Sequence, residues 1–243
     1  MAHFYLSDEL SADSRGSILT LAGSEGHHAQ SVSRIREGEQ IQLGNGHGVI
    51  ALATVVGSSK GELSLRVDDI AMRERPAHRF TLVQALAKTD RDERAVEATT
   101  ELGIDVVIPW QSERSVSRWD ATKAAKGQAK WATIAREACK QCIRPFVPEV
   151  LQVVSSAELM AALEGQLVLV LEPTGGEKLS EVDLSKSTNI ALVVGPEGGI
   201  SDKELDLFRA SGARIVSVGT NIMRTSTAGT AALGVVMSRL GYL

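Results

Sequence analysis

The alternation of apolar and polar residues divides the chain into two regions. Up to about residue 72, short apolar or alternating runs are separated by glycine-rich turns, which is typical of a small β-rich domain. One helix is expected over 26–38, because Ala29, Val32 and Ile35 recur at helical spacing and Gly38 can end the helix. The predicted strands of this region cover residues 40–45, 49–57 and 62–70.

Beyond residue 79, apolar runs of strand length alternate with helical patterns. This alternation predicts an α/β domain with a mostly parallel sheet. The charged stretch before it contains Pro76 and separates the two patterns, so we expect domains at 1–72 and 80–243 joined by a linker at 73–79. The predicted strands cover 80–88, 104–110, 166–173, 189–195 and 213–219, and the predicted helices cover 91–103, 126–142, 201–212 and 226–240.

Three loops follow strands of the predicted parallel sheet, at the edge where ligands bind in such sheets. They are LEPTGG (171–176), GPEGG (195–199) and GTNIMRTSTAG (219–229). GPEGG matches neither the dinucleotide nor the triphosphate glycine pattern. Its backbone amides and carbonyls suit an adenine or a ribose at least as well as a phosphate. The glycines alone are equally compatible with a plain strand-to-helix turn.

Composition sets limits on this picture. The chain has 243 residues, 43% hydrophobic and 23% charged, which is enough to bury a core without disulfides or metals. Neither a membrane-spanning run nor a signal peptide is visible, so we expect a cytoplasmic protein that does not bind membranes. The histidines lack paired ligand spacing and no metal is expected. Cys139 and Cys142 fall late in a predicted helix and are interpreted as structural thiols.

The chain is acidic overall but contains a locally basic segment. The formal net charge is −4, which argues against a nucleic-acid partner, yet residues 114–144 hold eight lysines or arginines against two acids. A local surplus of this kind indicates either a nucleic-acid footprint or a solvated helix face. Within it, Arg114 and Arg118 have the side chain that best binds phosphate and stacks on bases, although surface arginines are common.

Four segments, taken in order, resemble the ribosomal RNA small subunit methyltransferase E (RsmE) family of the SPOUT superfamily. The resemblance covers nearly the whole chain. It implies an N-terminal PUA-like β-barrel that binds RNA, and a C-terminal α/β methyltransferase domain with a trefoil knot that forms a homodimer. The segments are GHHAQSVSRIREG (26–38), TTELGIDVVIPWQSERSV (99–116), ALVVGPEGGIS (191–201) and SVGTNIMRTSTA (217–228).

The same resemblance implies an enzyme that uses S-adenosylmethionine to methylate N3 of one uridine in 16S rRNA of the small ribosomal subunit. Arg224 is expected to stabilise negative charge on the base or to bind a neighbouring phosphate. Glu197 is a weaker candidate for accepting the N3 proton, and its other role is to hold the loop. The cofactor-binding residues implied are Leu171, Glu172, Pro173, Gly195, Pro196, Glu197, Gly198, Gly199, Val218, Gly219, Ile222, Met223, Arg224, Thr225 and Thr227. The expected RNA-binding residues are His27, His28, Arg34, Arg36, Lys88, Arg91, Arg114 and Arg118.

Two positions depart from the family pattern. Ser226 stands where the family usually has a glutamate, and Lys88-Thr89-Asp90 stands where it usually has lysine–glycine–aspartate. Two other functions therefore stay open. One is a sister SPOUT enzyme that methylates a ribose 2′-oxygen or another base. The other is a non-catalytic RNA-binding ribosome factor, which only the Ser226 departure favours.

Overall fold

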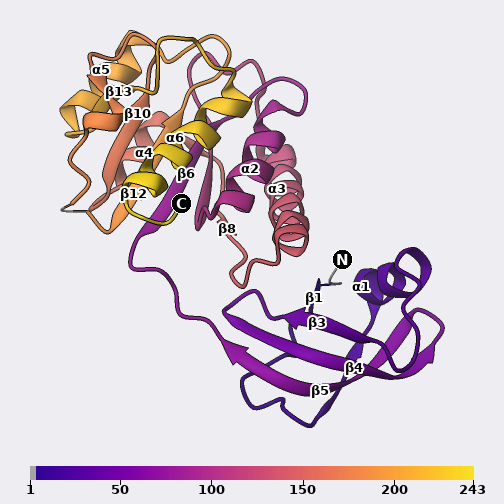
Figure 1. Ribbon diagram of the computed structural model, residues 1–243. Coiled ribbons are helices and arrows are strands. Elements are labelled where there is room, and N and C mark those ends of the chain that lie inside the picture. The colour runs from indigo at the N-terminus through magenta and orange to yellow at the C-terminus, as the bar shows by residue number, and fades with distance from the viewer. Residues whose placement is uncertain (1–3, 186) are drawn as a thin grey trace. The chain divides into compact units, whose positions relative to one another are not determined.

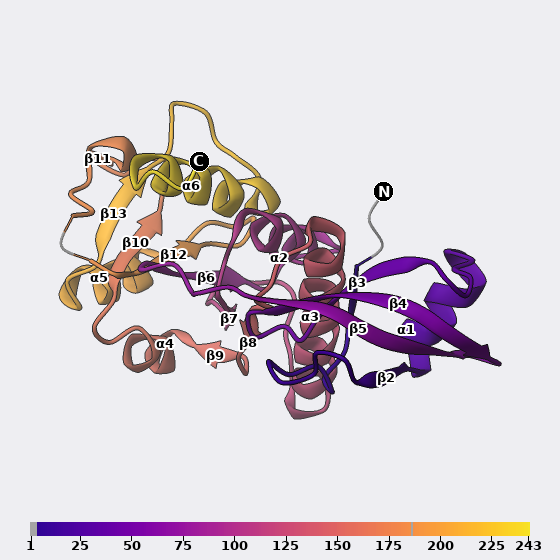
Figure 2. The same cartoon turned by 60° about the horizontal axis from the view of Figure 1, so that its bottom comes forward.

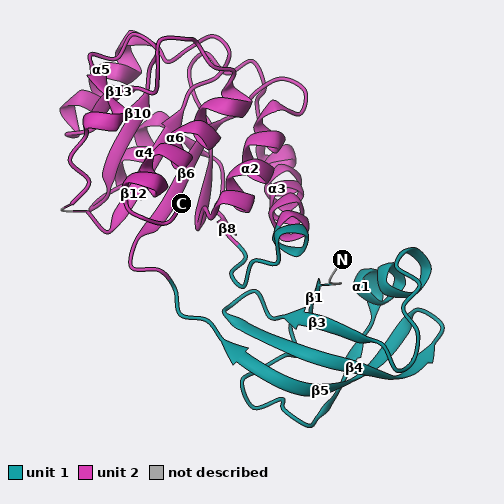
Figure 3. Ribbon diagram, viewed as in Figure 1, with its two compact units in different colours: residues 1–75, 139–147 teal, residues 76–138, 148–243 magenta. Residues whose placement is uncertain are grey.

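The computed structural model describes residues 4–185 and 187–243, and it divides into two compact units (Figure 3). The first unit contains the chain up to Arg75 together with Cys139–Val147. The second contains Pro76–Ala138 and Pro148–Leu243. The chain passes between the units within the predicted linker, but residues 139–147, which the sequence assigned to the second domain, pack with the first.

The first unit is built on a five-stranded mixed sheet with the order β1-β3-β4-β5-β2 (Figure 1). β1 pairs with β3 in parallel and the other pairs are antiparallel. Alternate side chains of the long central strands are fully buried, Ala53 and Leu65 among them, and form the core of this unit. The strands are β1 (Phe4–Leu6), β2 (Ile18–Leu21), β3 (Gln40–Gly44), β4 (Val49–Ser59) and β5 (Glu62–Met72).

The helix expected over 26–38 has a different form. Helix α1 (Gly23–His27) continues directly into a π-helical turn, His28–Val32. A Cβ atom on Gly26 would lie 2.4 Å from the carbonyl oxygens of Gly61 and Leu21, so only glycine allows this close packing against the sheet. The prediction that Val32 faces inward is wrong, because the wider π turn changes the direction of its side chain, which is 66% exposed.

Residues 139–147 complete the first unit through both charge and packing. Lys140 Nζ lies 3.1 Å from Glu25 Oε1, and the two side chains are only 9% and 10% exposed. Phe146 is buried and forms an isolated bridge with His47. A Cβ on Gly48 would lie 2.8 Å from the Phe146 ring, so this glycine provides the space that the ring occupies.

The second unit has an eight-stranded sheet in which every hydrogen-bonded pair is parallel, with the order β11-β13-β10-β12-β6-β7-β8 and β9 beside β7. The prediction of an α/β domain is confirmed. The strands are β6 (Arg79–Ala85), β7 (Val106–Gln111), β8 (Glu149–Val150), β9 (Val154–Ser155), β10 (Leu167–Leu171), β11 (Glu177–Lys178), β12 (Asn189–Val194) and β13 (Arg214–Ser217).

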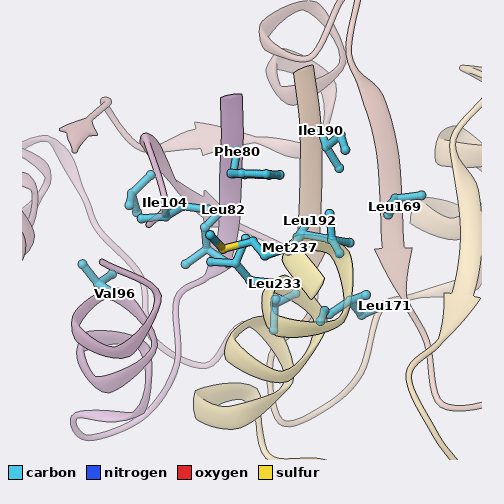
Figure 4. Packing of buried hydrophobic residues seen from close by; sticks show 14 of the residues in the cluster. Phe80, Leu82, Val96, Ile104, Leu169, Leu171, Ile190, Leu192, Leu233 and Met237 are labelled. Carbon is cyan, nitrogen blue, oxygen red and sulfur yellow. The ribbon is translucent and has the colours of Figure 1, made fainter. Parts of the chain in front are cut away.

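Alternate residues of the strands point to opposite faces of this sheet, and both faces are apolar. Helices therefore cover both faces. Phe80 and Leu82 join one core cluster, shown with α2 and α6 in Figure 4, whereas Val83 joins a second cluster with residues of α4 and α5. Figure 2 shows α6 and α4 on opposite sides of the strands. The helices are α2 (Arg91–Leu102), α3 (Ala121–Cys142), α4 (Ser156–Ala162), a 3₁₀ turn (Leu179–Glu181), α5 (Asp202–Ala210) and α6 (Thr225–Arg239).

The packing of α6 fixes the height of its first turn above the sheet. A Cβ on Gly229 would lie 2.9 Å from Leu82 Cδ1 and 3.2 Å from Val194 Cγ2. The backbone of α6 therefore approaches β6 and β12 closely, and its N-terminus lies beside the carboxyl ends of these strands. Among the residues that the structure describes, none of the helices is long and apolar enough to cross a bilayer.

Candidate functional site

A cleft with a volume of about 300 Å³ opens at the carboxyl ends of β10, β12 and β13. Parallel sheets place their ligand sites at this edge. The cleft contains every residue predicted for the cofactor except Gly198 and Thr227. Its lining consists of Arg91, Leu171, Glu172, Pro173, Val194, Gly195, Pro196, Glu197, Gly199, Ile200, Val218, Gly219, Asn221, Ile222, Met223, Arg224, Thr225 and Ala228.

The two exceptions have local causes. A Cβ on Gly198 would lie 3.3 Å from the Cβ of Arg114, so this glycine packs against the neighbouring loop. Thr227 is exposed on the first turn of α6. Conversely, Asn221 and Ala228 line the cleft but were not predicted from the sequence. Both belong to the predicted loop 219–229, which was the signal that could have identified them.

The GPEGG segment is a tight turn. The backbone N–H of Gly199 donates to the carbonyl of Pro196 over 2.9 Å, and Gly199 has φ +73°, which favours glycine. A Cβ on Gly195 would lie 2.7 Å from Ile200 Cγ1, so this position also requires glycine. These glycines serve the turn itself and leave its backbone facing the cleft.

Thr225 connects three parts of the cleft through one hydroxyl. Its Oγ1 donates to the carbonyl of Gly195 over 2.8 Å and accepts from Gln84 Nε2 over 2.8 Å. Gln84 is fully buried on β6, and Thr225 is the first residue of α6. The first turn of α6, the GPEGG loop and β6 are thereby held together.

Glu197 connects the GPEGG loop to the loop that follows β6. Its Oε1 accepts a hydrogen bond from the backbone N–H of Lys88 and pairs with Arg91, each over 3.1 Å. Thr89, next to Lys88, has φ +64°. Asp92 closes the same loop by accepting from the N–H of Ala87 over 3.0 Å, and burial raises the pKa of its carboxyl above the ordinary value.

On the other side, the loop after β7 holds the same segment through Arg114. Its Nη1 lies 3.3 Å from the carbonyl oxygens of both Gly198 and Ile200. Arg118 donates to the carbonyl of Glu113 over 2.8 Å. Both arginines were predicted to bind RNA, and both make hydrogen bonds inside the second unit.

Arg224 precedes α6 and is exposed at the cleft. Its carbonyl accepts from the N–H groups of Thr227 and Ala228, over 2.8 and 3.0 Å, so the backbone at this point is fixed. No ion pair joins its guanidinium to a described residue. It therefore differs from Arg91, the other cation of the cleft, which is paired with Glu197.

The remaining residues predicted to bind RNA lie in the first unit. His27, Arg34 and Arg36 are exposed, while His28 packs edge-on against Tyr5 with ring centroids 5.9 Å apart. Arg34 has φ +55° and so extends from a constrained backbone. The basic surplus on and around α3 is partly neutralised, since three of its lysines pair with acids: Lys123 with Asp120, Lys130 with Glu93 and Lys140 with Glu25.

Within residues 4–185 and 187–243, no group of three or more histidine, cysteine, aspartate or glutamate side chains is placed to hold a metal ion. Cys139 is buried and its thiol lies 3.5 Å from the carbonyl oxygen of Phe146, while Cys142 is half-buried.

Comparison with known proteins identifies the family. A model described as an RNA methyltransferase domain matches residues 73–237, and one described as an RNA methyltransferase PUA domain matches residues 21–68. Ribosomal RNA small subunit methyltransferase E of Mycobacterium bovis is 38% identical over 228 residues, which cover 91% of this chain and 86% of the relative.

Solved structures agree over the full length. A ribosomal RNA small subunit methyltransferase E from Neisseria gonorrhoeae, bound to S-adenosyl methionine, has a TM-score of 0.89 at 27% identity and covers 99% of this chain and 98% of its own. A Legionella pneumophila protein in complex with the cofactor SAM has a TM-score of 0.91 at 29% identity, covering 98% of each chain. The chain belongs to the ribosomal RNA small subunit methyltransferase E family of SPOUT-type RNA methyltransferases.

Proposed function

We propose that this protein transfers a methyl group from S-adenosylmethionine to N3 of one uridine in 16S rRNA. The observation that carries the proposal is the cleft at the carboxyl edge of the parallel sheet, which gathers the three predicted loops in a chain of this family. A cytoplasmic location follows from this proposal, since the small-subunit rRNA is there.

The cleft fits a nucleoside cofactor. It is lined by apolar side chains, Leu171 and Met223 among them, and by backbone groups of the GPEGG loop. Its volume of about 300 Å³ lies at the lower end of the range for small-molecule sites. The loops after β10, β12 and β13 would hold the cofactor, which when bound supplies an electrophilic methyl group. Similar proteins from two bacteria were solved with this cofactor bound.

Arg224 is the group that we assign to the target base. The base has to leave its stack to enter the cleft, at a cost of about a few kcal/mol. Loss of the N3 proton leaves negative charge on the ring, and a fixed cation beside it stabilises that charge. Arg224 fits this role because it lines the cleft and is not paired with any described carboxylate.

The experiment that tests the function is transfer of labelled methyl groups from S-adenosylmethionine to small-subunit particles, followed by mass spectrometry of the nucleosides. We expect 3-methyluridine from the native protein. We expect Arg224→Ala to lower kcat by about 10²–10³ with little change in KM for the cofactor. A 2′-O-methylated nucleoside or another methylated base would identify a sister activity, and RNA binding without any transfer would identify a binding factor.

The RNA path is proposed to include His27, His28, Arg34 and Arg36 on the first unit. The second unit would contribute Lys88 and Arg91 beside the cleft, together with Arg114 and Arg118. Reversing the charge of Arg34 and Arg36 should weaken RNA binding and reduce the dependence of affinity on salt concentration. An unchanged salt dependence would remove these two arginines from the path.

We further propose a homodimer in which α6 of a second copy covers α6 of the first. One face of α6 is buried against the sheet, but its other face carries Ala231, Gly234 and Val235, which are apolar and only half-buried. Sedimentation should show a dimer of the native chain and a monomer for Ala231→Arg. The control is Ala132→Arg on the exposed face of α3, which should stay dimeric. A native monomer would contradict the proposal.

A further inference from the structure

The carboxylate of Glu204, in the first turn of α5, lies where three elements of the second unit meet. Its side chain is almost completely buried. Oε1 accepts from the backbone N–H of Glu113 over 2.8 Å and from Ser156 Oγ over 2.6 Å. Oε2 accepts from the backbone N–H of Ser201 over 3.1 Å. One side chain therefore joins the loop after β7, the start of α4 and the end of the GPEGGIS segment.

Glu204 also belongs to a capping box with Ser201, in which each side chain bonds to the other residue's backbone N–H. The same motif occurs at α4, where Ser155 and Glu158 form a capping box with equivalent contacts. The two boxes differ in one respect. Among the described residues, exposed Glu158 bonds only within its own box, through Oε2, whereas Glu204 uses its other oxygen to reach Glu113 and Ser156.

These extra contacts lead directly to the cleft. Glu113, held by Glu204, immediately precedes Arg114, whose guanidinium bonds to the carbonyls of Gly198 and Ile200. Ser201 Oγ also lies 2.7 Å from Glu113 Oε2, which gives a second link between the same two loops. Gly199 and Ile200 line the cleft. A shift of the Glu113–Arg114 backbone would therefore move the wall on which the cofactor is proposed to lie.

We propose that Glu204 is a positioning residue for cofactor binding: it fixes the GPEGG loop by holding Ser201 on one side and the Glu113–Arg114 segment on the other. This inference rests on the proposed use of the cleft for S-adenosylmethionine. Glu204 itself is not among the residues that line the cleft, so its effect is transmitted through the two loops.

The substitution Glu204→Gln tests this assignment. An amide has one acceptor oxygen and one NH₂ donor, so in either orientation its NH₂ meets a backbone N–H, that of Glu113 or that of Ser201. At Glu158 the same substitution can keep the single oxygen that the box uses. Leaving buried donors unsatisfied should weaken cofactor binding by about tenfold or more in Glu204→Gln, whereas Glu158→Gln should bind as the native chain does.

The measurement is calorimetric binding of S-adenosylmethionine to the full chain, together with KM for the cofactor and kcat at saturating cofactor. A positioning role raises Kd and KM for the cofactor in Glu204→Gln and leaves kcat close to native. Loss of fold alone would lower the number of binding sites and leave the Kd of the remaining sites unchanged. A native Kd in a folded Glu204→Gln protein would overturn the proposal.

Ser156→Ala keeps the test decisive if Glu204→Gln does not fold. This change removes the hydrogen bond to Glu204 Oε1 and the one that Ser156 Oγ accepts from Trp110 Nε1. It leaves the capping box of α5 intact, so we expect a smaller increase in Kd, about twofold to fivefold. An unchanged Kd in this variant, with Glu204→Gln unfolded, would show that Glu204 serves stability only. Absence of binding by the native chain is a different result, because it would contradict the proposed function instead.

Discussion

At the scale of single residues, the carboxylate of Glu197 lies between two loops. Its Oε1 accepts from the backbone N–H of Lys88 and pairs with Arg91. That arrangement favours a brace between the loops over a proton acceptor. The two roles differ in magnitude: removing a general base costs about 10²–10⁴ in rate, whereas a half-exposed ion pair contributes about 0–1 kcal/mol.

We therefore expect Glu197→Gln to lower kcat by less than about tenfold, because the amide oxygen can still accept from Lys88 and only the charge facing Arg91 is lost. The measurement is single-turnover methyl transfer with both substrates saturating. Arg224→Ala, with its larger expected loss, is the comparison. A decrease of a hundredfold or more in Glu197→Gln would assign the proton transfer to this carboxylate.

Thr89 is a second residue-scale feature, since a β-branched side chain at φ +64° is strained. The left-handed conformation costs a residue with a Cβ about 1–2 kcal/mol, which the greater freedom of glycine in the unfolded chain offsets in part. Thr89→Gly should raise the free energy of unfolding by up to about 1 kcal/mol, measured by denaturant titration. Thr89→Ala keeps the Cβ and should gain less; equal gains would indicate the hydroxyl rather than the backbone.

Sequence patterns indicated which loops meet at one edge of the sheet, but not which side chains of those loops are in contact. The three loops indicated the cleft, because strand order in a parallel sheet brings their ends to one edge. They did not indicate that Arg114 bonds to the GPEGG loop or that Glu197 meets Lys88. Such contacts join residues about a hundred positions apart in the chain and depend on how two loops pack, which no local pattern encodes.

At the scale of elements, the sequence predicts the start of a helix where the capping residues are close together in the chain. Ser201 followed three residues later by Glu204, ahead of a helical pattern, is a sequence that predicts a capping box, and the structure has that box. The equivalent box at Ser155 and Glu158 carried the same signal for α4, which was missed. Helix α3 begins at Ala121 rather than at 126, because the side chain of Asp120 accepts from the N–H of Lys123. The π turn after α1, His28–Val32, had no local signal in the sequence.

The exposed box at α4 leads to a prediction about pH. Hydrogen bonds from the backbone N–H and the hydroxyl of Ser155 lower the pKa of Glu158 below its ordinary value of 4.5. A carboxyl whose pKa is lowered by folding contributes stability that is present above its unfolded pKa and is lost as pH falls through its folded pKa. The native chain should therefore be more stable than Glu158→Gln at pH 7, and the difference should shrink as pH decreases below about 4.5.

The measurement for that prediction is denaturant unfolding of both proteins between pH 7 and the acid limit of reversible folding. Ser155→Ala removes the hydroxyl bond and keeps the backbone N–H bond to Glu158, so its difference from the native chain should also shrink at low pH, but by a smaller amount. A difference between native and Glu158→Gln proteins that stays constant over this range would show that ionisation of Glu158 is not linked to folding.

At the scale of the whole molecule, the change from a glycine-punctuated β pattern to a strand–helix pattern predicted two kinds of domain, and the structure shows both. The sequence could not show that the first unit is discontinuous. Residues 139–147 follow a helix of the second unit, and only tertiary packing shows that Lys140 meets Glu25 and that Phe146 lies over Gly48. The knot implied by the resemblance stays a prediction.

Phe146 allows the discontinuous unit to be tested in the intact chain. Its ring is buried in the first unit, where it stacks under the guanidinium of Arg75 at 4.4 Å and fills the space above Gly48. Phe146→Ala should cost about 3–5 kcal/mol, mostly in that unit. Hydrogen exchange should then show reduced protection in β3, β4 and β5 with near-native protection in β6, β10 and β12.

Phe208→Ala, a matched change in the core of the second unit, should reverse the pattern. Equal loss of protection in both units after Phe146→Ala would show that the two units unfold together. That result would contradict the prediction that each packed unit has its own stability.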